Sequence, residues 1–283
     1  MEPVSGAWVV LHRVGPDRSG PLDSLRSDAS GRYRFEYVRS GSEDAVYFVS
    51  AMYGGIAYFS RPLTETRIGG RAGEITVFDT TSAKVPISIR GHHIVISAVD
   101  TRALRSVVEV FELSNDSSVT RIAASETPDG ATWTTHLLPS ASNFRVTQGD
   151  IPTDAVAFAN GRASVFAPLA PGVKQFSISY SVPANLFPLR VPLEGRTDVY
   201  EVLIEDETGS VTGPKIKEMD PVTVEARNFR RFLGADVPQS SITVIDLPPA
   251  AATRTIDPRY MVALTLLIGG AMIVALARAL RRR

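Results

Sequence analysis

The chain has no cysteine among its 283 residues. This absence excludes disulfide bonds, thiolate zinc sites and cysteine nucleophiles. Histidine is scarce as well, with four copies, so a metal site or a general base would draw on very few side chains. Neither sign of charge is in excess, because 30 lysine and arginine residues balance 30 aspartate and glutamate residues. A neutral chain lacks the basic field that nucleic-acid binding needs, so we expect no nucleic-acid partner.

Catalytic and cofactor motifs are also missing from the sequence. Gly-x-Ser-x-Gly, Ser-x-x-Lys and His-Glu-x-x-His do not occur, and neither does the Cys-x-x-Cys-His pattern of haem attachment. The glycine-rich run at 69–73 lacks the Gly-Lys-Ser/Thr of a phosphate loop, so a hairpin connection is the better interpretation. We therefore assign no catalytic residue and no cofactor, and we expect a protein that is not an enzyme.

One uncharged stretch runs from Tyr260 to Ala277, and four of the last six residues of the chain are arginine. Eighteen helical residues rise about 27 Å, close to the thickness of the hydrocarbon core of a bilayer. A core helix of a soluble domain would not normally be apolar around its whole circumference beside so many arginines. We therefore predict a stalk over 248–258, a transmembrane helix over 259–280 that contacts the lipid bilayer, and a cytoplasmic basic end over 281–283.

The arginines also predict the orientation, because basic residues beside a span favour the cytoplasmic side. The preceding residues would then lie in the periplasm or another extracytoplasmic space. Such a body has to be exported, yet the first six residues contain neither the basic nor the apolar region of a signal peptide. Two explanations stay open: a start that is incomplete or processed, or a reversed, tail-anchored topology, which the positive-inside rule opposes.

The rest of the sequence has the texture of an all-β protein. Short β-branched and aromatic stretches alternate with clusters of Gly, Ser, Asp and Pro, at the spacing of antiparallel sandwiches. The clearest stretches are 8–12, 33–37, 46–50, 56–59, 93–96, 107–113, 121–123, 132–137, 163–166, 174–180, 199–204 and 242–245. Two pieces before the anchor have helical character, a turn at 100–104 and the segment 224–232. The predicted fold is tandem antiparallel β-sandwich domains followed by a C-terminal transmembrane helix.

The first domain is expected over 1–82, and it carries a motif. A Pro-Val-Ser-Gly lead enters a strand, and the later Ser-Asp-x-x-Gly-x-Tyr-x-Phe unit turns the chain into the next one. Asp28 can cap this turn, Gly31 can supply a positive φ, and Tyr33 and Phe35 alternate onto one face. Over roughly residues 3–79 the pattern resembles the carboxypeptidase regulatory-like family, a transthyretin-like β-sandwich. The resemblance implies a non-catalytic spacer or binding module.

The second domain is expected over 83–247. A segment of this length is large for one sandwich, so one elaborated domain or two small domains dividing near 183–192 would fit, and we prefer the single domain. A Pro-Gly turn at 171–172 feeds a strand that ends at Tyr180.

Two adjacent histidines are weak candidates for metal ligands. His92 and His93 could both reach a metal from a loop, with Asp79 or Asp100 adding oxygen ligands. In a strand, however, neighbouring side chains point to opposite faces. The acidic turn at 205–209 could hold calcium, but it lacks the ligand spacing of a calcium loop. We therefore favour no metal site, and His12 and His136 look like ordinary strand positions.

The functional prediction concerns partners. Gly270, Ala271, Ala275 and Ala279 form a small-residue stripe that lets another membrane helix approach closely. The first domain also contains aromatic residues that either fill its core or supply an interface, namely Tyr47, Tyr53, Tyr58 and Phe59. Core filling is the default interpretation.

The leading hypothesis is a non-catalytic, membrane-anchored extracytoplasmic subunit that binds or braces other proteins of a bacterial membrane complex. The chain is similar in organisation to the extrinsic β-rich accessory subunits of photosynthetic reaction-centre complexes, although no motif carries that resemblance. The alternative is a carbohydrate- or cell-envelope-binding module, or a metal-dependent enzyme using His92 and His93.

Overall fold

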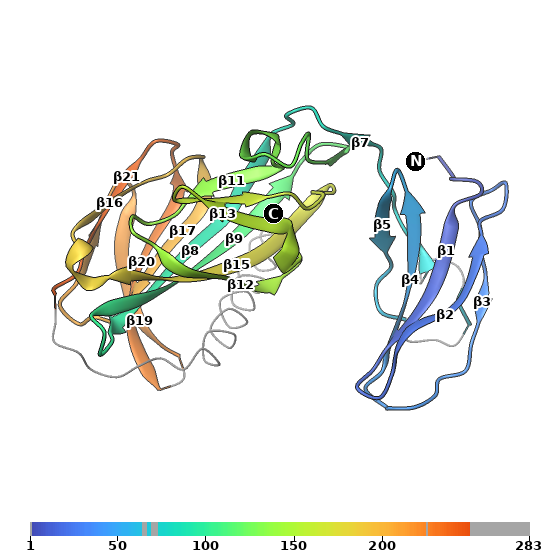
Figure 1. Ribbon diagram of the computed structural model, residues 1–283, viewed down its shortest axis with the longest axis horizontal. Helices are drawn as coiled ribbons and strands as arrows, with labels where there is room; N and C mark the ends of the chain where they lie inside the picture. Colours follow the sequence, from blue (N-terminus) through green and yellow to red (C-terminus); the bar gives the residue numbers. More distant parts are fainter. Residues whose placement is uncertain (1, 64–66, 69–72, 225, 250–283) are drawn as a thin grey trace. The chain divides into compact units, whose positions relative to one another are not determined.

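The computed structural model describes residues 2–63, 67–68, 73–224 and 226–249, and these residues form an all-β protein with a few short 3₁₀ turns (Figure 1). The chain divides into two compact units. Unit 1 comprises Met1–Thr81 together with Ser118–Thr120, and unit 2 comprises the remaining residues. Two short strands, β7 (Thr80–Thr81) and β10 (Thr120–Arg121), lie where the chain passes from one unit to the other.

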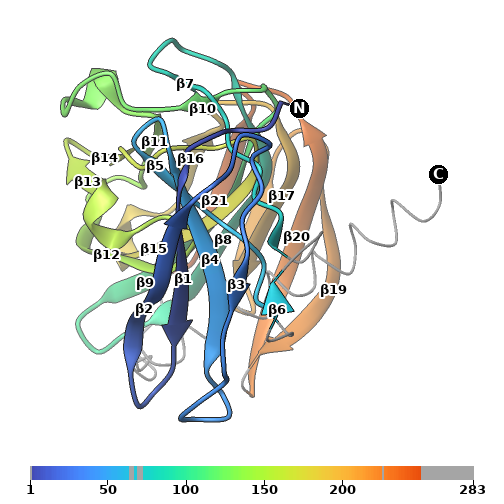
Figure 2. The ribbon, with the colours of Figure 1, turned by 90° about the vertical axis from the view of Figure 1, so that its right-hand side faces the viewer.

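Unit 1 contains an antiparallel sheet of four strands in the order β2-β1-β4-β5. The strands are β1 (Trp8–Val14), β2 (Ser19–Arg26), β4 (Val46–Tyr53) and β5 (Ile56–Phe59). A second, two-stranded sheet pairs β3 (Phe35–Glu36) with β6 (Arg67–Ile68). Figure 2 shows β2, β1 and β4 lying side by side along their length.

The core of unit 1 lies on one face of the four-stranded sheet. Alternate residues of β1 and β4, such as Val9, Leu11, Tyr47 and Val49, are almost completely buried. They pack with Phe35 and with aromatic and aliphatic side chains of the neighbouring loops. The period of two in these strands therefore separates an inner face, which is the core, from an outer face.

The predicted turn before β3 has the geometry its residues favour. Asp28 Oδ1 accepts hydrogen bonds from the amides of Ser30 and Arg32, each at 2.8 Å. Gly31 has φ +67°, and its amide donates to the Asp28 carbonyl. A side chain on Gly31 would meet Pro3 and the backbone of Val4 at about 3.0 Å, so close approach of the chain also requires glycine.

Unit 2 is built on a sheet of seven strands in the order β12-β15-β9-β8-β17-β20-β19. The strands are β8 (Ile87–Val99), β9 (Leu104–Asn115), β12 (Ser142–Gly149), β15 (Gly172–Pro183), β17 (Thr197–Ile204), β19 (Ile216–Val224) and β20 (Arg227–Val237). The pair β8 and β17 is parallel, whereas the other pairs in this sheet are antiparallel. The expectation of antiparallel pairing alone is wrong at this point, because period cannot reveal which distant strands become neighbours.

Two smaller sheets of three strands complete unit 2. One contains β11 (Trp133–His136), β14 (Arg162–Val165) and β13 (Val156–Ala159), and the other β16 (Leu189–Pro192), β21 (Ile242–Asp246) and β18 (Ser210–Thr212). The short 3₁₀ turns are η2 (Pro128–Gly130), η3 (Thr153–Ala155) and η4 (Ala184–Leu186). The segment 183–192, where we considered a division, thus lies within one compact unit.

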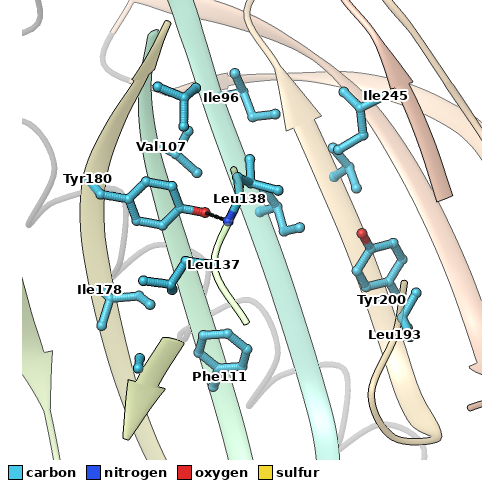
Figure 3. Close-up of a cluster of buried hydrophobic side chains, with 14 of the residues drawn as sticks. Ile96, Val107, Phe111, Leu137, Leu138, Ile178, Tyr180, Leu193, Tyr200 and Ile245 are labelled. Carbon is cyan, nitrogen blue, oxygen red and sulfur yellow. Dashed lines mark hydrogen bonds between the residues drawn. The ribbon is translucent and has the colours of Figure 1, made fainter. Parts of the chain in front are cut away.

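The main core of unit 2 fills the space between the seven-stranded sheet and the two smaller sheets. Figure 3 shows Phe111, Tyr180 and Tyr200 reaching into this core from three strands of the large sheet. Leu138 belongs to the segment after β11, and its amide donates a hydrogen bond to the Tyr180 hydroxyl at 3.4 Å. A smaller apolar cluster, which includes Val95, Val108 and Val110, lies on the opposite face of the same sheet.

One secondary-structure expectation is wrong. The segment 224–232, which we considered helical, includes the end of β19 and the first half of β20. The polar and aromatic residues there fit a strand whose two faces are both partly covered, and tertiary pairing overrides a short helical pattern. Strand β2, with few buried side chains, gave no sequence signal because it lies at an edge of its sheet.

Within the described residues, no helix is long and apolar enough to cross a membrane. The predicted transmembrane helix, its small-residue stripe and the basic end lie outside those residues.

Candidate functional site

The four-stranded sheet of unit 1 has an outer face that carries exposed apolar side chains. Cross-strand pairs on β1 and β4 define it: Trp8 lies opposite Met52, His12 opposite Phe48, and Val14 opposite Val46. Strand β5 extends it, because Phe59 pairs with Ser50 and Ala57 with Met52. The outer face therefore consists of the outward residues of three strands, Trp8, Val10, His12, Val14, Val46, Phe48, Ser50, Met52, Ala57 and Phe59.

This outer face is apolar although it is exposed. Phe59 is 60% exposed, Val14 46%, and Trp8, Val46 and Met52 are each 43% exposed. A solvated sheet face normally carries polar side chains opposite its core. Here the outward positions of β1, β4 and β5 contain no lysine, arginine, aspartate or glutamate. Exposed apolar patches of this kind mark sites of interaction.

The single ionisable group on the outer face is held in a form without charge. His12 stacks on Phe48, with 5.1 Å between ring centroids, and shares a hydrogen bond of 2.8 Å with Ser50. Burial lowers the pKa of His12, so the neutral ring is favoured at neutral pH. At the rim, the Arg26 guanidinium lies over the Trp8 ring, 5.5 Å from its centroid. The centre of the face is therefore uncharged, and the Arg26 cation at its rim is paired with an aromatic ring.

The aromatic residues noted in the sequence divide between core and surface. Tyr47 and Tyr58 are buried, whereas Phe59 belongs to the outer face. Tyr53 donates a hydrogen bond to Asp79 Oδ1 at 2.8 Å. Sequence reasoning missed Trp8, Val10 and Val14 as surface residues. Their alternation with Val9 and Leu11 was visible, but the run from Trp8 to Leu11 is apolar at every position and so does not show which face of the strand is covered.

The two candidate histidines for metal binding are not brought together. His92 pairs with Phe111 and Tyr200, so it faces the main core of unit 2. His93 pairs with Val110 and Glu201, so it lies on the opposite face of the sheet. Neighbouring residues of a regular strand cannot direct both side chains to one ion.

His93 is part of a buried ionic cluster. Its Nδ1 lies 2.7 Å from Glu201 Oε2, and Arg231 Nε donates to the other carboxylate oxygen of Glu201. Burial alone would raise the pKa of Glu201, but the hydrogen bonds from His93 and Arg231 outweigh it and lower that pKa. The carboxylate is thus ionised and fully partnered, which explains the cluster as a structural ion pair.

The oxygen ligands considered with these histidines lie elsewhere. Asp79 belongs to unit 1, and Asp100 follows β8, where it accepts hydrogen bonds from the amides of Arg102 and Leu104. In the acidic turn, Glu205 pairs with Arg227 and Asp206 with Arg105. Among the residues that the structure describes, no group of three or more His, Cys, Asp or Glu side chains could hold a metal ion.

Comparison with known proteins adds little to these observations. No protein-family model matches the sequence, and no curated protein is significantly similar to it. Among solved structures, the native leukotriene A4 hydrolase from Saccharomyces cerevisiae aligns with 61% of this chain and 30% of its own, at 11% identity and a TM-score of 0.32. A likeness at this level carries no argument, and the chain spans less than a third of that enzyme. The resemblance of unit 1 to the carboxypeptidase regulatory-like family stays a prediction.

Proposed function

We propose that this chain is a non-catalytic, membrane-anchored subunit that binds another protein of the same bacterial membrane through the outer face of unit 1. The observation that carries the proposal is the apolar, uncharged outer face on a sheet whose other face is a complete core. Burying such a face against a partner stabilises the complex by about 25 cal/mol for each Å² of apolar area removed from water.

The composition of the face indicates the chemistry of the partner. The centres of protein interfaces are enriched in aromatic residues and methionine and are depleted of charge. Trp8, Phe48, Met52 and Phe59 follow that pattern, and Arg26 at the rim follows the enrichment in arginine. A surface without charge offers no attraction to a charged one, so the partner is a protein with an apolar, uncharged patch.

The small size of the outer face favours a partner that is confined to the same membrane as this chain. Three strands about 4.8 Å apart and up to seven residues long span roughly 330 Å². A stable complex between freely diffusing proteins buries about 800 Å² on each partner, so this face alone is too small for a stable homodimer in solution. Confinement of both partners to one membrane raises their effective concentration and compensates for the small area. The predicted span at 259–280 would supply that confinement, and a photosynthetic reaction-centre assembly is one complex of the expected kind.

Site-specific photocrosslinking in native membranes tests the proposal. A photoreactive phenylalanine analogue at position 59 should give an adduct with one other protein, because this side chain lies within the outer face. The same analogue at position 38 is the matched control, since Val38 is 83% exposed but lies in the loop before β4, outside the face. The control should give no such adduct.

The variant Trp8→Ser should abolish the adduct from position 59 without lowering the thermal stability of unit 1, because Trp8 is outside the core. An adduct that persists in this variant, an adduct of equal yield from position 38, or crosslinking only between two copies of the chain would contradict the proposal.

A further inference from the structure

Unit 2 contains a small cavity that lies beneath one of its covering segments. The cavity has a volume of about 130 Å³ and lies between β8 and β9 on one side and the segments around Leu137–Pro139 and β16 on the other. Its walls are mainly apolar and include Ile89, Phe111, Leu137 and Leu193. For comparison, an apolar protein cavity of about 150 Å³ accepts benzene. The space therefore suits one compact molecule of about that size.

The cavity contains a buried polar pair. His92 and Glu109 both line it, and the Glu109 side chain is only 3% exposed. The Tyr180 hydroxyl donates to Glu109 Oε1, while His92 Nε2 lies 2.6 Å from Glu109 Oε2. Burial, together with the Glu109 charge, keeps the pKa of Tyr180 well above its ordinary value, so Tyr180 acts as a donor. Both carboxylate oxygens of Glu109 are therefore occupied.

Glu109 determines which tautomer His92 adopts. A carboxylate only accepts, so the proton of a neutral imidazole resides on Nε2, and Nδ1 keeps its lone pair. Among the described residues, the hydrogen bond of His92 is made through Nε2, which leaves Nδ1 available. Stacking on Phe111, at 4.4 Å between centroids, and edge contact with Tyr200 hold the ring in place. His92 is therefore a fixed acceptor in the lining of the cavity.

We propose that this cavity binds a compact neutral molecule with an apolar ring and one hydroxyl group, and that the hydroxyl donates to His92 Nδ1. The apolar walls accept the ring, and the acceptor discriminates against molecules that lack a donor.

The comparison of phenol with toluene tests this inference, because the two molecules have the same shape and differ in the hydroxyl group. The full-length chain labelled with ¹⁵N is titrated with each, at a pH above the titration range of an ordinary histidine and with protein-free detergent as the blank. Phenol should bind at least about tenfold more tightly than toluene, because a ligand without a donor would cover the acceptor and leave it unpaired.

Long-range ¹H–¹⁵N spectra report the tautomer directly, and four histidines keep the assignment tractable. His92 should carry its proton on Nε2, and phenol but not toluene should shift its Nδ1 signal. A proton on Nδ1, equal affinities for the two molecules, or no saturable binding would overturn the proposal. These readings need no mutation, so they hold even if a variant of His92 fails to fold.

The variant His92→Phe keeps the ring contact with Phe111 and removes the acceptor, so it should abolish the preference for phenol. His12→Phe is the matched control, because His12 lies in β1 of unit 1 and is not among the residues that line the cavity. It should leave the preference unchanged. Loss of the preference in the control, or its retention in a folded His92→Phe variant, would refute the assignment to His92.

Discussion

Single residues in this protein show how buried charge is accommodated. Arg105 is fully buried in unit 2 and donates to the Ser97 carbonyl at 2.9 Å and to the Pro248 carbonyl at 2.8 Å. It also pairs with Asp206 at 3.1 Å. Burial raises the pKa of Asp206, but the hydrogen bond from Arg105 and those from Thr208 outweigh this and lower it. The arginine thus connects β8, the acidic turn and the segment after β21.

Replacing Arg105 by alanine should lower the free energy of unfolding of unit 2 by about 3–5 kcal/mol at neutral pH, because Asp206 would be left without its main partner. Fluorescence of Trp133 during urea unfolding, in a Trp8→Phe background, measures this. Arg102→Ala is the control, since Arg102 is 70% exposed beside Asp100, and it should cost less than about 1 kcal/mol.

The loss of stability caused by Arg105→Ala should depend on pH in a defined direction. The pKa of Asp206 is lower in the folded state than in the unfolded state. The stability that Asp206 contributes is therefore complete above the pKa of an unfolded aspartate, and it is lost as pH falls through the pKa of Asp206 in the folded state. The difference between wild type and Arg105→Ala should therefore shrink below the ordinary titration range of aspartate. A difference that grows on acidification would contradict the role given to this pair.

Among the elements, the turn at Asp28–Gly31 controls how the chain enters the β3 strand. Gly6 offers a matched comparison, because it has a similar φ of +71° but nothing within 4 Å of an added Cβ. Gly31, at φ +67°, faces the backbone of Val4 at 3.0 Å. The two glycines therefore separate the cost of the backbone conformation from the cost of contact.

Gly6→Ala should destabilise unit 1 by about 1–2 kcal/mol, the cost of a left-handed conformation for an L-residue. Gly31→Ala should cost at least about 1 kcal/mol more, because Pro3 and Val4 must move. Urea unfolding followed by Trp8 fluorescence, in a Trp133→Phe background, measures both. Equal effects of the two substitutions would show that the close approach to Val4 is unimportant for stability.

For the whole molecule, the main expectation is attachment to a membrane by the uncharged stretch at 260–277. A chain lacking these residues should be released from membranes by alkaline carbonate, whereas the full chain should be retained. Replacing the stretch with an unrelated run of leucine and alanine should restore retention, because hydropathy alone drives insertion. Extraction of the full chain by carbonate would contradict the predicted span.

The orientation is tested in the same membranes. Protease added to spheroplasts should digest both β-rich units if they face outward. Protection of the units together with cleavage at the basic end would instead indicate the tail-anchored topology that we considered.

Much of the architecture follows from local patterns. Alternation of β-branched and aromatic residues predicts most strands, because the period of two belongs to each strand by itself. The Asp28 and Gly31 turn is readable for the same reason, since capping and positive φ are properties of a few adjacent residues. The absence of cysteine and the scarcity of histidine similarly restrict the available chemistry without any reference to structure.

What only the tertiary structure decided is which side of each strand is covered and which distant strands meet. The sequence alone determined that the protein is rich in strands. The membrane span over 259–280 stays a prediction from the sequence. The sequence could not determine that β8 and β17 are parallel neighbours, that His92 faces Glu109 while His93 faces Glu201, or that Trp8 and Phe59 share an exposed face. The physical reason is that pairing and coverage depend on contacts between residues far apart in the chain, and local periodicity contains no information about them.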